Sequence, residues 1–309
     1  MSHLLAADIG GTNLRLAIID QQGQILDESR VQAELSLHSA QCQIEAETHV
    51  ITTLSEAMLG FLGQSSYSAH SAGIGFPGFF RGDSGLLASS PNLPLLQEFP
   101  LADKLGEALA MPTAVQNDAL CAAIGEHRFG AGKGQSNLLH ITLGTGVGGG
   151  LILNHKPYCG EHGMAMEFGH LSVEQNNGRL CGCGNHGCVE SYASASAVVQ
   201  RYAEKTGTNS NAKAIYQLAC DNNEIAISIL QQAGCYLGKS IAEAIKLLDI
   251  STVTVSGGLS GAWPILHPAI MHALDANLIP PLKGKVDVQR STLDDNAGLL
   301  GAAAIAPNS

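Results

Sequence analysis

Two segments of the chain share one pattern, in which a glycine-containing turn joins two apolar strands. The first is AADIGGTNLRLAIID at residues 6–20, and the second is NLLHITLGTGVGGGLILN at residues 137–154. Apolar runs of this length that are bounded by glycine predict β-strands. Because the pattern occurs once in each half of the chain, we expect a duplicated α/β unit, with the glycine turn of each copy facing a central cleft.

The remainder of the sequence alternates short apolar strands with helical patterns. Strands are predicted at 25–31, 71–76, 113–116 and 251–256, and helices at 41–63, 100–110, 119–131, 190–205, 224–248 and 298–306. This alternation is typical of α/β proteins. We expect two lobes, a smaller N-terminal one of residues 1–117 with about 292–309, and a larger C-terminal one of residues 118–291 that carries the cysteine loop described below.

The composition is that of a folded protein that binds neither nucleic acid nor membranes. The 309 residues suffice for about two domains, and 45% hydrophobic with 14% charged residues exclude a disordered or fibrous chain. The formal net charge is −11, and Lys and Arg form no cluster of the kind that binds nucleic acid or an anionic membrane. No apolar run is long enough to span a bilayer, and the start, MSHLLAADIGG, lacks the basic region of a secretory signal. We therefore expect a cytoplasmic protein whose eight cysteines stay reduced.

The two glycine turns are candidates for binding phosphate groups. In the first, Gly10–Asn13 combines a permissive backbone with hydrogen-bond donors, and the neighbouring Asp8 suits water-mediated Mg²⁺ binding. A single turn of this kind is explained equally well as a plain hairpin. The second turn, Gly144–Gly146, favours a phosphate chain held by both turns. Residues 144–149 also match the dinucleotide-binding fingerprint, which we reject because the strand-like LILN follows where a helix is required.

The cysteine cluster CGCGNHGC at 181–188 is the most specific motif in the chain. Cys181, Cys183 and Cys188, together with His170, supply four ligands for tetrahedral Zn²⁺. His186 competes with His170 as the fourth ligand, but its position inside the loop makes its reach awkward, so we favour His170. Four protein ligands leave no open coordination position, so the metal would be structural. The alternative is a set of buried or redox-active free cysteines.

Three carboxylates lie beside predicted turns and loops. Glu167 and Glu190 bracket the cysteine loop, where they are either ligands of sugar hydroxyls or solvated surface groups. Asp118 follows the predicted strand 113–116 and precedes a helix. Ligands of α/β proteins gather beyond the carboxyl ends of strands, which is where a general base belongs. On the local sequence alone, however, helix N-capping is the favoured role of Asp118.

In the order of its motifs the chain resembles the ROK sugar kinases, a family of the actin-like (ribonuclease H-like) superfamily. The motifs are DIGGTN (8–13), GIGFPG (73–78), SPNL (90–93), QNDA (116–119), LGTGVGGG (143–150), EFGH (167–170), CGCGNHGCVE (181–190), SGGLS (256–260) and AGLLGAA (297–303). They span nearly the whole chain, and EFGH with CxCGxxGCxE is very specific to the family. The ASASA stretch after the cysteine loop is most similar to the bacterial glucokinase branch. The resemblance implies a two-lobed actin-like ATPase fold and ATP-dependent phosphorylation of a hexose at its 6-hydroxyl, with glucose as the first expectation.

The resemblance also implies roles for individual residues. Asp118 would be the general base. The sugar would contact Gly78, Asn92, Asn117, Asp118, Glu167, His170 and Glu190. ATP would contact Asp8, Gly10, Gly11, Thr12, Asn13, Gly144, Thr145, Gly146, Gly257 and Gly258, with Asp8 near Mg²⁺. Structural Zn²⁺ would be held by His170, Cys181, Cys183 and Cys188, and His170 would use its other ring nitrogen toward the sugar.

The chain departs from the family pattern at Met166, since a glycine commonly precedes the glutamate of EFGH. We expect this change to alter sugar affinity or preference rather than to abolish activity. Fructose, N-acetylglucosamine and N-acetylmannosamine are the alternative substrates, although kinases for the last sugar can lack a glutamate at the position of Glu167.

Other classes of the family are less compatible with this sequence. Its sugar-responsive transcriptional repressors carry an N-terminal helix-turn-helix domain, for which we expect no room because the first phosphate turn begins at residue 8. A catalytically inactive sugar sensor is a third alternative, against which Asp118 and both glycine turns argue. Relatives are often dimers or tetramers, so we expect a homodimer or homotetramer.

Overall fold

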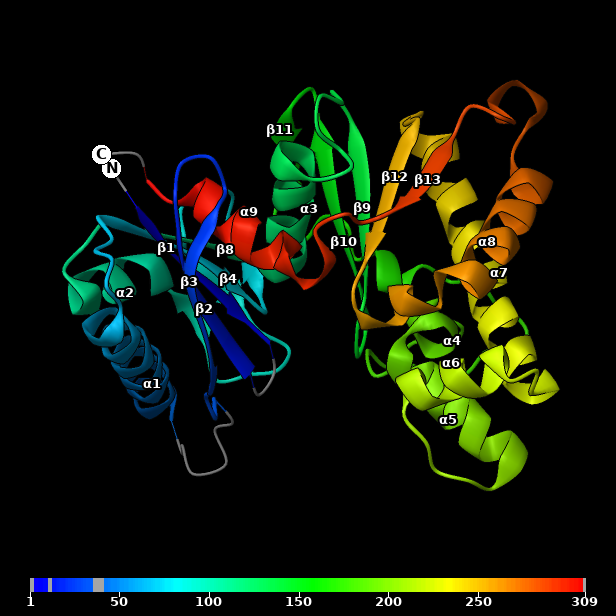
Figure 1. The fold of residues 1–309 in the computed structure, drawn as a ribbon, viewed down its shortest axis with the longest axis horizontal. Helices are drawn as coiled ribbons and strands as arrows, with labels where there is room; N and C mark the ends of the chain where they lie inside the picture. Colours follow the sequence, from blue (N-terminus) through cyan, green and yellow to red (C-terminus); the bar gives the residue numbers. More distant parts are fainter. Residues whose placement is uncertain (1–2, 11–12, 36–41, 308–309) are drawn as a thin grey trace. The chain divides into compact units, whose positions relative to one another are not determined.

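The computed structural model describes residues 3–10, 13–35 and 42–307, and it divides into two compact units. Unit 1 consists of residues 1–134, 156–165 and 296–309, and unit 2 consists of residues 135–155 and 166–295 (Figure 1). Each unit contains a mixed β-sheet and its own hydrophobic core.

Unit 1 is built on a five-stranded sheet of order β3-β2-β1-β4-β8. Its strands are β1 (Leu4–Ile9), β2 (Asn13–Ile19), β3 (Ile25–Gln32), β4 (Ser71–Phe76) and β8 (Thr113–Asn117), and its helices are α1 (Gln43–Gln64), α2 (Leu101–Leu109), α3 (Asp118–Phe129) and α9 (Ala297–Ile305). Three short strands, β5 (Phe79–Phe80), β6 (Leu87–Ser89) and β7 (Gln97–Phe99), form a second, smaller sheet. Strand β1 is antiparallel to β2 and parallel to β4, so the first glycine turn closes a hairpin.

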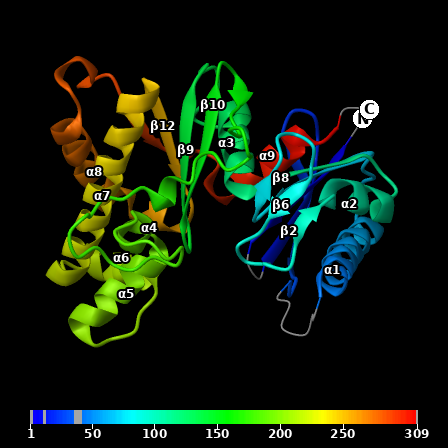
Figure 2. The same cartoon turned by 180° about the vertical axis from the view of Figure 1, so that it is seen from behind.

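The alternation of side chains along β1 gives the two faces of this sheet different partners. Leu5 and Ala7 belong to the core that includes α1, which lies with α2 on one face of the sheet (Figure 2). Helices α3 and α9 lie on the opposite face of the sheet. They cross closely, because a methyl group at Gly125 or at Gly301 would overlap with the backbone of the other helix. Asp8 therefore points to the side of the sheet where the first turns of α3 and α9 lie.

Unit 2 repeats this topology. Its strands β10 (Val147–Leu153), β9 (Leu138–Leu143), β12 (Thr252–Ser256) and β13 (Asp287–Arg290) lie side by side in this order, and the two-residue strand β11 (Lys156–Pro157) follows β10 in the chain. Strand β9 is antiparallel to β10 and parallel to β12, as β1 is to β2 and β4. The predicted α/β fold with a duplicated unit is confirmed.

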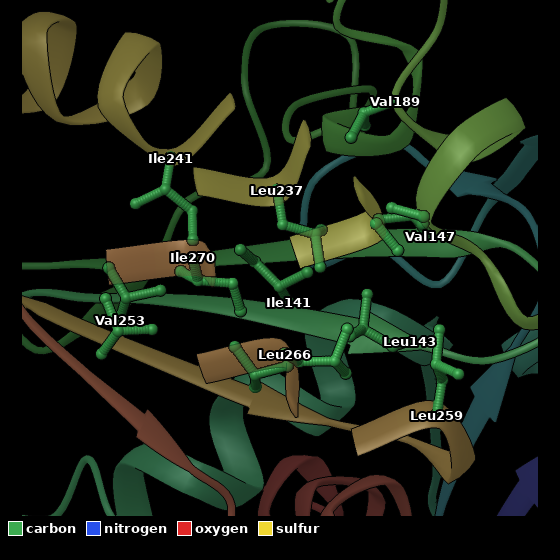
Figure 3. Packing of buried hydrophobic residues seen from close by; sticks show 14 of the residues in the cluster. Ile141, Leu143, Val147, Val189, Leu237, Ile241, Val253, Leu259, Leu266 and Ile270 are labelled. Atoms are coloured by element: carbon green, nitrogen blue, oxygen red, sulfur yellow. The ribbon is translucent and has the colours of Figure 1, made fainter. Parts of the chain in front are cut away.

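The helices of unit 2 pack with its sheet, and the first of them begins directly after the loop that carries the cysteines. They are α4 (Glu190–Ala193), α5 (Ala195–Thr206), α6 (Ala212–Cys220), α7 (Glu224–Leu248) and α8 (Trp263–Asn277), with 3-10 turns at Phe168–His170, Gly258–Ala262, Pro280–Leu282 and Asp294–Asn296. Helices α7 and α8 run side by side, and Leu237 and Ile270 from them pack with Ile141 of β9 (Figure 3). This core supports the strands whose ends carry the second glycine turn. Among the helices that the structure describes, none combines the length and apolarity needed to cross a membrane.

The expected lobe boundaries differ from the division that the structure shows. Helix α3 begins at Asp118 but belongs to unit 1, because it packs against α9, and residues 156–165 also join unit 1. The two units are of nearly equal length rather than one small and one large. Helix α6 and the strands β5, β6 and β7 were not predicted from the sequence.

A buried histidine of β9, His140, contacts two hydroxyl side chains of the neighbouring strand β12. His140 is fully buried, and its ring nitrogens lie 2.8 Å from Oγ1 of Thr254 and 2.9 Å from Oγ of Ser256. Burial lowers the pKa of His140 from its ordinary 6.5 to about 3, so the ring is neutral in the folded protein.

This histidine predicts a loss of stability in acid. The lowered folded-state pKa means that the unfolded chain binds the proton more readily, so stability is full above pH 6.5 and falls as the pH drops toward about 3. Between pH 7.5 and pH 5 we expect a loss of about 2 kcal/mol from this residue. His140→Gln should lack this loss in chemical unfolding followed by the fluorescence of Trp263, which lies in unit 2. An identical pH dependence in both proteins would contradict the assignment.

Candidate active site and metal cluster

Asp118 lies where β8 ends and α3 begins. The N-cap of α3 is Asn117, whose Oδ1 accepts a hydrogen bond from the backbone N–H of Leu120 at 3.0 Å. The capping role that the local sequence favoured for Asp118 is therefore wrong, because the preceding residue fills it. Asp118 is half-buried in the first turn of α3, and its Oδ1 accepts from the N–H of Ala119 at 2.8 Å. Burial raises the pKa of Asp118, and the hydrogen bond from Ala119 opposes this rise.

A second carboxylate, that of Asp8, lies close to Asp118. The two residues are on either side of Gly75 of β4, since a methyl group placed there would lie 3.6 Å from Oδ1 of Asp8 and 3.6 Å from Cα of Asp118. The carboxylate of Asp8 also contacts the first turn of α9, because a methyl group at Gly298 would lie 2.7 Å from its Oδ2. A helix N-terminus stabilises a carboxylate in its charged form. Unit 1 therefore places two carboxylates near the ends of β1 and β8, the parallel strands on either side of β4.

Asn117 connects this pair of carboxylates to the next predicted sugar-binding residues. Its Nδ2 donates to the carbonyl oxygen of Gly78 at 3.1 Å. Ser90 donates from Oγ to the carbonyl oxygen of Pro77 at 2.7 Å, which anchors the SPNL turn beside Gly78. Asn92 of that turn is exposed.

The first glycine turn closes with a hydrogen bond from the N–H of Gly10 to the carbonyl oxygen of Asn13, at 2.9 Å. Gly10 and Asn13 are exposed at the end of the β1–β2 hairpin. Gly11 and Thr12, which complete the predicted phosphate turn, lie outside the described residues.

Gln116 is a buried residue of β8 that positions its neighbours and was not among the predicted site residues. Its Oε1 accepts from the N–H of Asn117 at 2.8 Å, and its Nε2 donates to the carbonyl oxygen of Gly82 at 3.1 Å. The signal that could have identified it is a glutamine inside an apolar strand, since buried amides require partners.

The second glycine turn joins β9 to β10 in unit 2, and the end of β12 lies beside the end of β9. The N–H of Gly144 donates to the carbonyl oxygen of Gly146 at 3.0 Å, and Thr145 at its tip is exposed. Gly257, which follows β12, has φ of +88° and lies against the backbone of Leu143, so only glycine suits it. Gly258 is exposed, and nothing lies within 4 Å of the position that a methyl group would take on it.

The predicted zinc ligands converge in unit 2. The ligand atoms of His170, Cys181, Cys183 and Cys188 all lie within 4.8 Å of one another. Nδ1 of His170 is 3.6 Å from Sγ of Cys181. The alternative ligand, His186, instead places its Nδ1 3.0 Å from the carbonyl oxygen of Gly178. This donor set and its spacing fit a tetrahedral Zn²⁺ site.

The thiols differ in their readiness to ionise. The backbone N–H of Asn185 lowers the pKa of the Cys183 thiol, whereas burial raises that of Cys188 to about 12. Metal binding requires the thiolate form, which the exposed Cys183 reaches more readily than Cys188.

The free side of His170 faces a carboxylate. Its Nε2 lies 3.6 Å from Oε2 of Glu167, which is exposed at the start of the 3-10 turn Phe168–His170. Nδ1 therefore faces the cysteines while Nε2 and Glu167 face away from them. Glu190, the other carboxylate of the loop, is half-buried at the first position of α4.

Met166, where the chain departs from the family pattern, has φ of +68°. This left-handed conformation costs a residue with a side chain about 1 kcal/mol or more relative to glycine. Its side chain packs against the core of unit 2, which offsets part of that cost. The conformation gives a physical reason for the glycine that the family pattern has here.

Two truncations at this position separate the conformational cost from the packing. Both Met166→Gly and Met166→Ala remove the packed side chain, so we expect the glycine variant to be more stable than the alanine variant by about 1 kcal/mol. Chemical unfolding followed by Trp263 fluorescence measures the difference. At the exposed Met164, whose φ is not positive, the same pair should show no advantage for glycine. An alanine variant at 166 as stable as the glycine variant would refute the strain.

Comparison with known proteins shows similarity over the whole length of the chain. The sequence model of the ROK family matches residues 4–309. A glucokinase of Halalkalibacterium halodurans is 31% identical, with 96% of this chain and 92% of the relative covered. An N-acetylmannosamine kinase of Escherichia coli O157:H7 is 33% identical, with 98% and 97% covered. The crystal structure of a ROK family glucokinase from Streptomyces griseus in complex with glucose and AMPPNP has a TM-score of 0.85 at 30% identity, with 99% of both chains covered.

Proposed function

The chain belongs to the ROK family, with a fold of the actin-like ATPase type, and we propose that it transfers the γ-phosphoryl group of ATP to the 6-hydroxyl of glucose. The observation that carries this proposal is the similarity, over 99% of both chains, to a glucokinase that binds glucose and an ATP analogue. The pairing of Asp118 with Asp8, and the two glycine turns in matching topological positions, supply the chemistry that such a reaction needs.

Asp118 is the general base of the proposed reaction. Its carboxylate takes the proton of the 6-hydroxyl as that oxygen forms a bond to the γ-phosphorus, and the bond to the β,γ-bridging oxygen breaks to release ADP. The raised pKa brings Asp118 closer to neutral pH, which makes it a stronger base than an ordinary aspartate.

The glycine turns bind the nucleotide in this proposal. The turns Gly10–Asn13 and Gly144–Gly146 hold phosphate oxygens through backbone N–H groups other than those of Gly10 and Gly144, which are bonded within the turns. Gly257 and Gly258 lie by the nucleoside. Asp8 would hold Mg²⁺ through water, and the ion would supply positive charge beside the phosphates.

The sugar is bound by hydroxyl contacts to Glu167, His170, Glu190 and Asn117, with Gly78 and Asn92 closing the pocket. His170, Cys181, Cys183 and Cys188 would hold Zn²⁺ with four protein ligands, a structural site that would fix the loop carrying these groups. With Nδ1 of His170 committed to the metal, Nε2 would carry the ring proton and donate it in a hydrogen bond to the sugar.

We further propose a homodimer or homotetramer in the cytoplasm. The reduced cysteines of a zinc site and the use of ATP support an intracellular compartment. The N-acetylmannosamine kinase at 33% identity supports an N-acetylated hexosamine as the second candidate substrate.

An ADP-release assay with Mg-ATP tests the function across glucose, mannose, fructose and the three common N-acetylhexosamines. We expect the highest kcat/KM with glucose. Preference for another sugar would leave the proposed kinase activity in place and would attribute the change of substrate to the sugar loop beside Met166. Absence of turnover with all six sugars, in folded protein with zinc bound, would overturn the proposal.

A further inference from the structure

Glu190 contacts the second glycine turn as well as the cysteine loop. Its Oε2 accepts a hydrogen bond from the backbone N–H of Val147, the first residue after the turn, at 2.9 Å. A methyl group on Gly146 would overlap with the same oxygen. The carboxylate therefore lies directly against the turn, in a space that exists because residue 146 has no side chain.

The other carboxylate oxygen faces the cysteines. Oε1 lies 3.8 Å from Sγ of Cys181, and Glu190 follows Cys188 by two residues in the chain. One side chain thus spans from the cluster to the turn. Both contacts lie within unit 2.

The same segment holds the opposite end of the turn. The N–H of Ala195, the first residue of α5, donates to the carbonyl oxygen of Gly144 at 2.9 Å. The turn is therefore held on one side by the Glu190 carboxylate and on the other by the backbone of Ala195. Val147 is buried, so loss of the carboxylate would leave its N–H without this acceptor, which is costly away from water.

We propose that Glu190 is a positioning residue for the nucleotide, holding the Gly144–Gly146 turn in the shape that binds phosphate and linking that shape to the cysteine–histidine cluster. The role is additional to the sugar contact assigned to Glu190, and its bearing on ATP rests on the proposed function. It predicts that a residue of the sugar loop affects nucleotide affinity before any phosphoryl transfer occurs.

Calorimetric titration with Mg-AMPPNP and, separately, with glucose distinguishes the two roles of Glu190. Glu190→Ala should weaken AMPPNP binding about tenfold, because the turn loses its acceptor. Glu190→Gln retains an acceptor oxygen and should restore AMPPNP affinity to within about twofold of the native protein, while glucose binding stays weak because the charge is lost. Glu167→Ala is the matched control, since this exposed carboxylate faces Nε2 of His170, and it should weaken glucose binding alone. Unchanged AMPPNP affinity in Glu190→Ala, or no rescue by glutamine, would overturn the proposal.

Hydrogen exchange tests the contact without reference to the reaction. The amide of Val147 should exchange faster in Glu190→Ala than in the native protein and be protected again in Glu190→Gln. Equal protection in all three proteins would refute the positioning role even if the protein is a kinase. Native protein that fails to bind AMPPNP, with Val147 behaving as expected, would instead refute the proposed function and, with it, the effect on nucleotide.

The pair Glu190 and Gly146 offers a second measurement. Gly146→Ala should weaken AMPPNP binding strongly in the native background, because the new methyl group displaces the carboxylate. In the Glu190→Ala background the same change should weaken AMPPNP binding less, since the overlap with the carboxylate is gone. Additive effects of the two substitutions would contradict the direct contact.

Discussion

Replacing Asp118 by asparagine is expected to lower kcat about 10³-fold, while the dissociation constant for glucose stays within about threefold. Asparagine has nearly the same shape and can still accept the hydrogen bond from Ala119, so the start of α3 is preserved. It cannot take the proton of the attacking hydroxyl. The loss therefore falls on the chemical step and not on binding.

Steady-state kinetics and glucose titration of Asp118→Asn test this result. Asp103→Asn, on the exposed side of α2, is the matched control and should turn over at the native rate. The kcat/KM of the native protein should also fall on acidification, at a pH above 3.8, the ordinary pKa of aspartate. The reason is that the pKa of Asp118 is raised, and protonation of its carboxylate removes the base. Near-native turnover in the asparagine variant would remove Asp118 as the base.

Replacing Cys183 by serine is expected to release the zinc ion and to weaken glucose binding at least about tenfold. Three ligands remain, but a serine hydroxyl is a poor substitute for a thiolate. Without the ion, His170 is no longer fixed at Nδ1, and the orientation of Nε2 beside Glu167 is lost.

Zinc content measured by atomic spectroscopy and glucose affinity measured by calorimetry check this prediction together. Cys220→Ser provides the control, because Cys220 is exposed in α6 and is not part of the cluster. The control should keep one zinc ion per chain and native glucose affinity. One tightly held equivalent of zinc in Cys183→Ser would contradict the ligand set.

The parts of the fold that were predicted correctly are those with a strong local signal. The β1–β2 and β9–β10 hairpins followed from apolar runs separated by glycine, and the repeated pattern led to the shared topology of the two units. Helix α6 was missed although it has nine residues, as do the predicted α2 and α9. Strands β5 to β7 were missed because two or three residues carry no periodicity.

In the candidate site, the local sequence predicted some features and not others. Cys181, Cys183 and Cys188 are close in sequence, so their convergence could be predicted. His170 was preferred to His186 because a ligand inside the loop reaches the metal position less easily. Adjacent Asn117 and Asp118 are both capping residue types, and only the structure distinguishes them.

Contacts between distant segments left no trace in the sequence. The approach of Glu190 to Val147 and the shared position of Asp8 and Asp118 beside Gly75 depend on the assembled sheets. The left-handed conformation of Met166 is likewise imposed by its surroundings, since nothing in a methionine predicts it.

Identification of the product by ³¹P NMR tests the account most directly. Native protein incubated with Mg-ATP and glucose should yield ADP and an equimolar sugar phosphate whose phosphorus couples to the two protons at C6. Release of ADP and inorganic phosphate without a sugar phosphate, or a phosphate attached elsewhere on the ring, would contradict transfer to the 6-hydroxyl.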